Sequence, residues 1–176
     1  MENADKKTVF DKTEKLVQYI RYLYAKQNNN QEITPIKLQK SLYFLFAIWG
    51  GMVVKSRNNE KYVDFDLSKY SKYLFKDQFE AWVYGPVIPS VYKNHKDSKT
   101  VTKEYDEGIF KGDQFLKETI SAILSDIFEI ADFKLVSISH EDECWKNRFD
   151  INDIIHETII PKDDIINEYA KRESVS

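Results

Sequence analysis

The residues best suited to catalysis or metal binding gather in one short stretch, which reads Ser-His-Glu-Asp-Glu-Cys-Trp over residues 139–145. His140 and Cys144 are four positions apart, so on a helix they would share one face. That face could supply two ligands of a zinc site, with Glu141 or His156 as a further ligand. The alternative is a buried Cys144 that acts as a small apolar side chain beside a tryptophan. We favour the buried cysteine and predict no metal ion.

The same stretch could hold a cysteine nucleophile or catalytic carboxylates. A His140 imidazolium would lower the pKa of the Cys144 thiol, but the sequence reveals no third group to orient the histidine and no oxyanion hole. Glu141, Asp142 and Glu143 could perform acid–base chemistry, yet at a helix start their charges simply favour the positive end of the helix dipole. With five glycines, the chain has none of the phosphate-binding or serine-nucleophile loop motifs. We therefore predict no enzyme and no cofactor.

A second dense segment, residues 80–92, combines three aromatic side chains with a Gly-Pro turn and a second proline. One interpretation is a rigid turn whose aromatics fill the core. The other is a preorganised protein-binding surface, because Trp and Tyr dominate the hot spots of interfaces. Lys93 and Lys96 nearby leave stacking on single-stranded bases as a further alternative. We predict that this surface is formed or supported by Trp82, Tyr84, Gly85, Pro86, Val87, Pro89 and Tyr92, and that a second cluster contains His140, Glu141 and Trp145.

The elements that must position these residues are mostly helices. Five Gly and four Pro in 176 residues leave long uninterrupted segments, and apolar residues recur in them at helical spacing. Thr34 and Pro35 predict the start of a central helix, and Gly50-Gly51 predicts its end. Ser139 and Asp142 resemble a capping box. We expect helices over 9–27, 34–49, 67–74, 89–95, 113–131 and 162–171, one more starting near residue 139, and an extended segment over 79–84.

These elements predict a mainly α fold, a compact single-domain helical bundle with a small β element, either short strands or a hairpin, around residues 55–84. The domain is expected to span 9–170, with flexible tails at 1–8 and 171–176. A single cysteine excludes an intrachain disulfide. The longest uncharged stretch, 41–54, is shorter than the roughly 20 residues of a membrane span. We therefore expect a cytoplasmic protein with no membrane partner.

The charge distribution is asymmetric. Residues 1–100 carry 17 Lys/Arg and 11 Asp/Glu, whereas residues 101–176 carry 9 and 18. An acidic second half disfavours nucleic acid as a partner and suits a basic protein surface, although a solvated acidic face would look the same. A DNA-binding regulator is a further class, but the exposed face of the central helix offers only Lys37 and Lys40.

Three segments resemble the Panacea domain, the SocA-like family. The first, Ile33–Phe44, is similar to the family pattern I-T-x-x-K-L-Q-K-L-L-Y-F. The second, Glu80–Tyr92, resembles E-A-W-x-Y-G-P-V-x-P-x-V-Y, and the third, Ser139–Trp145, resembles T-H-x-E-x-P-W. Cys144 stands where the family pattern has Pro, which argues against a shared thiol function. The residues of the first segment that match the family motif are Thr34, Lys37, Leu38, Gln39, Lys40, Leu42 and Tyr43; helical spacing alone places Leu38, Leu42 and Tyr43 in the core.

The resemblance, which extends over about 9–170, implies a mostly helical domain found in phage- and prophage-associated proteins and in toxin–antitoxin pairs. There the domain acts as the antitoxin and neutralises a cognate protein toxin by direct binding. Some relatives resemble adaptors that deliver a toxin to a protease, so a protease or chaperone is an alternative partner. The resemblance supplies no catalytic residues. The sequence leaves the identity of the toxin and the oligomeric state open.

Overall fold

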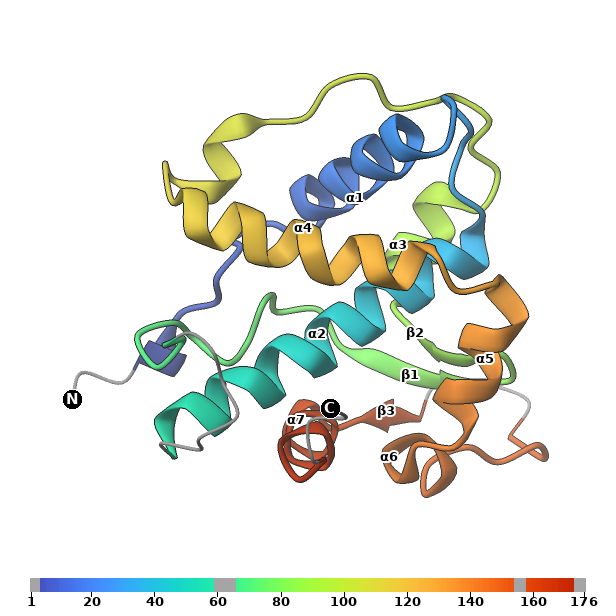
Figure 1. Cartoon of the computed structure of the whole chain (residues 1–176). Coiled ribbons are helices and arrows are strands. Elements are labelled where there is room, and N and C mark those ends of the chain that lie inside the picture. Colours follow the sequence, from blue (N-terminus) through green and yellow to red (C-terminus); the bar gives the residue numbers. More distant parts are fainter. Residues whose placement is uncertain (1–3, 59–65, 154–157, 173–176) are drawn as a thin grey trace.

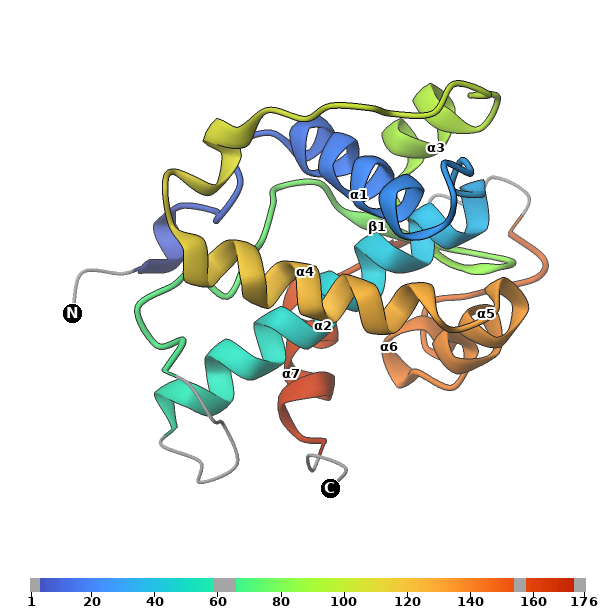
Figure 2. The same ribbon diagram turned by 45° about the horizontal axis from the view of Figure 1, so that its top comes forward.

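One long central helix organises the protein, which a computed structural model describes for residues 4–58, 66–153 and 158–172. Helix α2 (Pro35–Arg57) crosses the middle of the molecule, with α1 and α4 on one side and α7 on the other (Figures 1 and 2). The mainly α architecture predicted from the sequence is confirmed. The other helices are α1 (Thr13–Gln27), α3 (Pro89–His95), α4 (Gln114–Phe128), α5 (Asp132–His140), α6 (Glu143–Lys146) and α7 (Lys162–Ala170), with short 3-10 helices at Ala4–Lys6 and Glu107–Phe110.

Helix α2 starts where the sequence predicts and ends later. The Thr34 hydroxyl accepts a hydrogen bond from the Lys37 amide at 3.0 Å, which caps the helix. The predicted stop at Gly50-Gly51 is wrong, because the helix continues to Arg57. A Cβ on Gly50 would lie 2.5 Å from Cγ1 of Ile166, and a Cβ on Gly51 would lie 3.0 Å from the α7 backbone. The glycine pair therefore allows α7 to cross closely over α2.

Two predicted helical segments are irregular instead. The first helix begins at Thr13 rather than at residue 9, because the amides of Val9 and Phe10 donate to the carbonyls of Tyr73 and Leu74 at 3.0 and 2.8 Å. The same bonds explain why residues 67–74, predicted as a short helix, form turns and irregular chain. The two segments satisfy each other's backbone groups, so neither needs to be helical.

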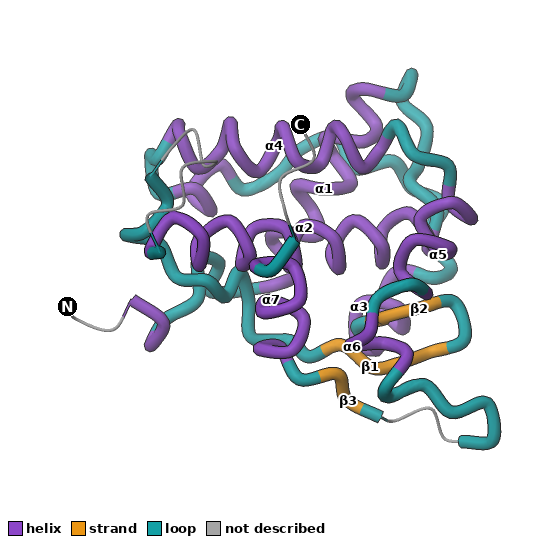
Figure 3. Tube along the Cα trace, turned by 60° about the horizontal axis from the view of Figure 1, so that its bottom comes forward, coloured by secondary structure: helices purple, strands orange, loops and turns teal. Residues whose placement is uncertain are grey.

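The β element is a three-stranded antiparallel sheet with the order β2-β1-β3 (Figure 3). Strands β1 (Phe79–Trp82) and β2 (Gly85–Val87) form a hairpin, and β3 (Ile159–Ile160) adds to the other edge of β1. The small β element is thus confirmed, although its strands lie at the end of the predicted range and beyond it. Of that range, residues 55–57 are helical and 59–65 lie outside the described residues.

The helix boundaries between residues 113 and 146 differ from the prediction. The expected helix over 113–131 ends at Phe128, and a separate helix, α5, follows from Asp132 to His140. Ser139 is not an N-cap, because it lies in the last turn of α5 and its hydroxyl donates to the Val136 carbonyl at 2.8 Å. Helix α6 then begins after Asp142, so the predicted capping box does not form.

The described ends of the chain contact the helical body. Asp5 forms a two-point ion pair with Arg57 at 2.9 and 3.0 Å, and Arg172 forms an ion pair with Asp142 at 2.6 Å. Within the described ranges, every helix is too short or too polar to cross a membrane.

Candidate functional site

The β1–β2 hairpin requires glycine at its turn. Val83 and Tyr84 form the turn, and Gly85 follows with φ of +100°, a conformation that L-residues with a side chain rarely adopt. A Cβ at Gly85 would also lie 2.9 Å from Nζ of Lys40 and closer still to Oγ of Ser139. The close packing of the turn against α2 and α5 therefore depends on the absence of a side chain here.

Two polar side chains of α2 hold the backbone that follows the turn. Gln39 forms a two-point amide pair with Ile88: its Oε1 accepts from the Ile88 amide at 2.9 Å, and its Nε2 donates to the Ile88 carbonyl at 3.3 Å. Lys40 Nζ donates to the Pro86 carbonyl at 2.9 Å. The first and second sequence motifs are thus in direct contact, and the first satisfies backbone groups of the second.

Lys40 is an unusual buried amine. Its residue is 1% exposed, and no ion pair joins it to a carboxylate in the described part of the chain. Desolvation favours the neutral amine and lowers the pKa of Lys40 to about 7. The sequence expectation that Lys37 and Lys40 occupy an exposed helix face is wrong, since both are buried.

Lys37 and Thr34 tie the start of α2 to the junction of α4 and α5. Lys37 Nζ donates to the carbonyls of Phe128, at 3.2 Å, and Ile130 at the C-terminal end of α4. Cations are favourable at this end of a helix. The Thr34 hydroxyl donates to Oδ2 of Asp132 at 2.5 Å. The remaining motif positions Leu38, Leu42 and Tyr43 are buried, as their spacing predicts.

Two aromatic side chains from α5 and α6 hold the hairpin from the other side. His140 Nε2 lies 3.0 Å from the Val83 carbonyl, and Trp145 Nε1 donates to the Trp82 carbonyl at 2.9 Å. The His140 and Trp145 rings stack with centroids 4.2 Å apart. Burial lowers the pKa of His140, so the ring is mainly neutral at pH 7. The third motif therefore fixes the carbonyls of the turn.

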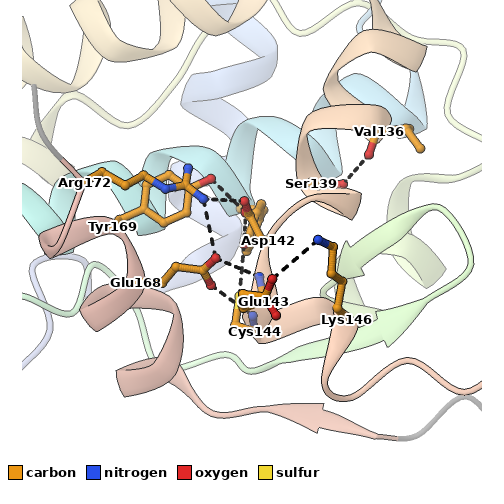
Figure 4. Close-up of polar contacts among 10 residues, drawn as sticks. Val136, Ser139, Asp142, Glu143, Cys144, Lys146, Glu168, Tyr169 and Arg172 are labelled. Atoms are coloured by element: carbon orange, nitrogen blue, oxygen red, sulfur yellow. Dashed lines mark hydrogen bonds and ion pairs between the residues drawn. The ribbon is translucent and has the colours of Figure 1, made fainter. Parts of the chain in front are cut away.

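A buried acidic cluster, in which Asp142 and Glu168 bind groups of α2, α6 and the α7 end of the chain, anchors α6 to α7 (Figure 4). Asp142 is 1% exposed, and its carboxylate accepts from the hydroxyls of Tyr43 at 2.5 Å and Tyr169 at 2.8 Å and from Arg172 at 2.6 Å. Glu168 accepts from the Glu143 and Cys144 amides at 2.7 and 2.9 Å, and so caps α6 in place of a local residue. The cluster positions Trp145 at the hairpin.

Cys144 sits inside this cluster rather than at a reactive surface. The residue is 4% exposed, and its sulfur lies 3.3 Å from the Tyr43 hydroxyl. Burial raises the pKa of the thiol to about 12, the direction opposite to that of a nucleophilic cysteine. Within the described ranges, no three His, Cys, Asp or Glu side chains are grouped as a metal site would require; His156 lies outside these ranges.

The predicted surface residues divide into a buried support and an exposed edge. Gly85, Pro86, Val87 and Trp145 are buried; Trp82, Pro89 and His140 are half-buried; and Tyr84, Tyr92 and Glu141 are exposed. The ring of Trp82 packs edge-on against Tyr92 at 5.2 Å between centroids. The structure thus brings the second and third motifs together and leaves only part of them open to a partner.

Two exposed residues escaped the sequence reasoning. Val83 is 50% exposed at the turn, and Phe133 is 65% exposed on the first turn of α5. The Phe133 ring lies 6.3 Å from the ring of Tyr84, which is 55% exposed. Phe133 lies outside the three motifs. The only local hint of its exposure is that an aromatic residue stands between the charged residues Asp132 and Lys134 at a helix start.

Comparison with known proteins gives one match. No curated protein and no solved structure shows significant similarity to the chain. One family model matches residues 62–146 of the chain. This segment contains the hairpin, α5 and most of the third motif's contacts, and the first motif precedes it. The family resemblance predicted from the sequence is therefore confirmed over residues 62–146, which match the model of the Antitoxin SocA-like, Panacea domain family.

Proposed function

We propose that the protein is an antitoxin that neutralises a cognate protein toxin by binding it directly. The observation that carries the proposal is the match of residues 62–146 to the SocA-like antitoxin family. That segment includes the hairpin turn and α5, where Val83, Tyr84 and Phe133 are at least half exposed. Exposed aromatic side chains on a fixed backbone are suited to protein–protein contact.

Occlusion of the toxin is the mechanism that the arrangement favours. The hairpin is held from α2 by Gln39 and Lys40 and from α5 and α6 by His140 and Trp145. A surface that is already ordered loses little conformational entropy when it binds. The buried, poorly ionised thiol of Cys144 gives the same region no evident nucleophile. The protein would then act stoichiometrically, by covering the toxin's active site or substrate surface.

Co-expression tests the proposal. The protein encoded by the adjacent gene is induced alone and together with this chain, and growth and toxin abundance are measured. We expect the neighbour to stop growth, this chain to restore it, and the two proteins to elute together in gel filtration with toxin abundance unchanged. A toxin level that falls only when a protease is present would replace occlusion by the adaptor mechanism. A non-toxic neighbour, or growth that is not restored, would refute the antitoxin function.

A further inference from the structure

We infer that Val83, Tyr84 and Phe133 form a docking knob, and that the partner face it enters is an apolar pocket with a basic rim. This inference rests on the proposed antitoxin function and specifies the chemistry of the toxin surface. The three side chains come from two elements, the hairpin turn and the first turn of α5, which lie at the same edge of the molecule (Figure 1).

The knob is apolar and open to solvent. Val83, Tyr84 and Phe133 are 50%, 55% and 65% exposed, and the Tyr84 and Phe133 rings touch with centroids 6.3 Å apart. Single exposed apolar residues are normal, but adjacent ones from separate elements make a patch of the kind that partners cover. Tyr and Phe also provide a large contact area with few rotatable bonds. The knob therefore has the composition of an interface hot spot.

The backbone under the knob is fixed before any partner arrives. The carbonyl of Val83 lies 3.0 Å from His140 Nε2, and the carbonyl of Trp82 accepts from Trp145 at 2.9 Å. Gly85 allows the turn to lie directly on Ser139 and Lys40. Val83 and Tyr84 are at least half exposed at the tip of this fixed turn, so the complement that we infer is a concave pocket rather than a flat face.

Charge around the knob indicates the rim of that pocket. From Glu129 to Asp150 the chain carries six acidic and three basic residues. Ion pairs engage three of the acidic residues and two of the basic ones: Asp132 with Lys37, Asp142 with Arg172, Glu143 with Lys146, and Arg148 with Asp164 of α7. Among the described residues of this segment, Glu129, Glu141 and Asp150 therefore remain against Lys134. Glu141 is exposed and directly follows His140, the residue that contacts the turn. Because complementary potentials govern encounter and register, a basic rim on the partner is the matching surface.

The apolar part of the inference is tested with Tyr84→Ala and Phe133→Ala against the toxin that the co-expression experiment identifies. Phe115→Ala is the matched control. Phe115 is 38% exposed and lies in the first turn of α4, at the end of that helix far from α5 (Figure 2). We expect each knob variant to raise the Kd by about 30-fold or more, and the control by less than about threefold. Thermal unfolding checks that all three variants remain folded. Knob variants that bind as tightly as the control would overturn the inference while leaving the antitoxin function standing.

The charge part is tested with Glu141→Lys and Glu118→Lys. Both variants change the net charge equally, but Glu118 is exposed on α4, where it accepts a hydrogen bond from Gln114. We expect Glu141→Lys to weaken binding about tenfold at low ionic strength, with the loss shrinking in 0.5 M salt, and Glu118→Lys to have a much smaller effect. Equal effects of the two variants would refute a local basic rim. A wild-type chain that binds no toxin would refute both the knob and the proposed function.

Discussion

The buried amine of Lys40 makes a prediction about how stability depends on pH. Lys40 is buried, its Nζ donates to the Pro86 carbonyl, and its pKa in the folded protein is about 7, against 10.5 for a free lysine. The unfolded chain therefore binds more protons than the folded chain between these two values. Since the free energy of unfolding rises with pH wherever the unfolded state holds more protons, Lys40 destabilises the fold most at and below pH 7 and least above pH 10.

The magnitude follows from the two pKa values. Between pH 7.5 and 9.5, the titration of one such lysine increases the free energy of unfolding by about 2.5 kcal/mol. Lys40→Met removes this titration and keeps a similar side-chain volume. At pH 7 it also removes an unfavourable contribution of about 4 kcal/mol, while the Pro86 carbonyl loses its donor at a cost of about 1–3 kcal/mol. We therefore expect Lys40→Met to be more stable than the wild type at pH 7 by about 1–3 kcal/mol.

Urea unfolding of both proteins at half-unit steps from pH 7.5 to 9.5 measures the effect. The pKa of His140 is lowered from 6.5, so this range lies above its titration. All other groups are shared, and the difference between the two proteins isolates Lys40. The expected advantage of the variant shrinks by about 2.5 kcal/mol across the range. A difference that does not change with pH would mean that Lys40 is not desolvated in the folded protein, and the structural reasoning would fail.

Three further predictions follow from the other contacts of the site. Gly85→Ala should lower the free energy of unfolding by more than about 2 kcal/mol, whereas Gly112→Ala, which also has positive φ but open space around it, should cost only about 1 kcal/mol; equal losses in denaturant unfolding would argue against the close packing of the turn. Asp142→Ala should cost about 3–5 kcal/mol, because it leaves two tyrosine hydroxyls without their acceptor and removes the nearer of the two carboxylates that pair with Arg172; a neutral result would contradict the buried cluster. The Cys144 thiol, whose pKa is raised to about 12, should react with a disulfide reagent at pH 8 far more slowly in the native protein than in urea, and equal rates would show that it is accessible.

The start of the central helix could be predicted from the sequence, whereas the burial of its polar side chains could not. Thr34 and Pro35 define a helix start by local capping, and that start is confirmed. A glycine pair near the end of a helical pattern predicts, from the local sequence alone, that the helix stops there. Here Gly50 instead makes room for α7, whose residues lie more than a hundred positions away in the chain. Periodicity assigns a lysine to the solvent face by default, so the burial of Lys37 and Lys40 could not be inferred from spacing.

The candidate site shows the same division. The second and third motifs are each visible in the sequence. The Gly-Pro pair predicts a turn in the second motif, but its position is wrong, because Val83 and Tyr84 form the turn and Gly85 and Pro86 begin β2. Their contact is not visible, because the bonds from His140 and Trp145 to the turn join segments that are about 60 residues apart. Phe133 acquires its place beside Tyr84 only through that packing. Exposure, which separates the knob from its support, is a property of the whole fold.

The contacts also assign different tasks to motif and non-motif residues. Gln39, Lys40, Gly85 and Trp145 all match the family patterns, and all are buried contacts that hold the hairpin in place. Val83 occupies an unspecified position of the second pattern, and Phe133 lies outside all three patterns, yet both are at least half exposed on the knob. Tyr84, the third side chain of the knob, does match the second pattern. The motifs therefore specify the support and one knob residue, and the other two side chains that a toxin would meet can change without loss of that support. On this reasoning, substitutions at positions 83 and 133 should alter which toxin is bound while leaving the free energy of unfolding within about 0.5 kcal/mol of the wild type, the range expected for surface changes.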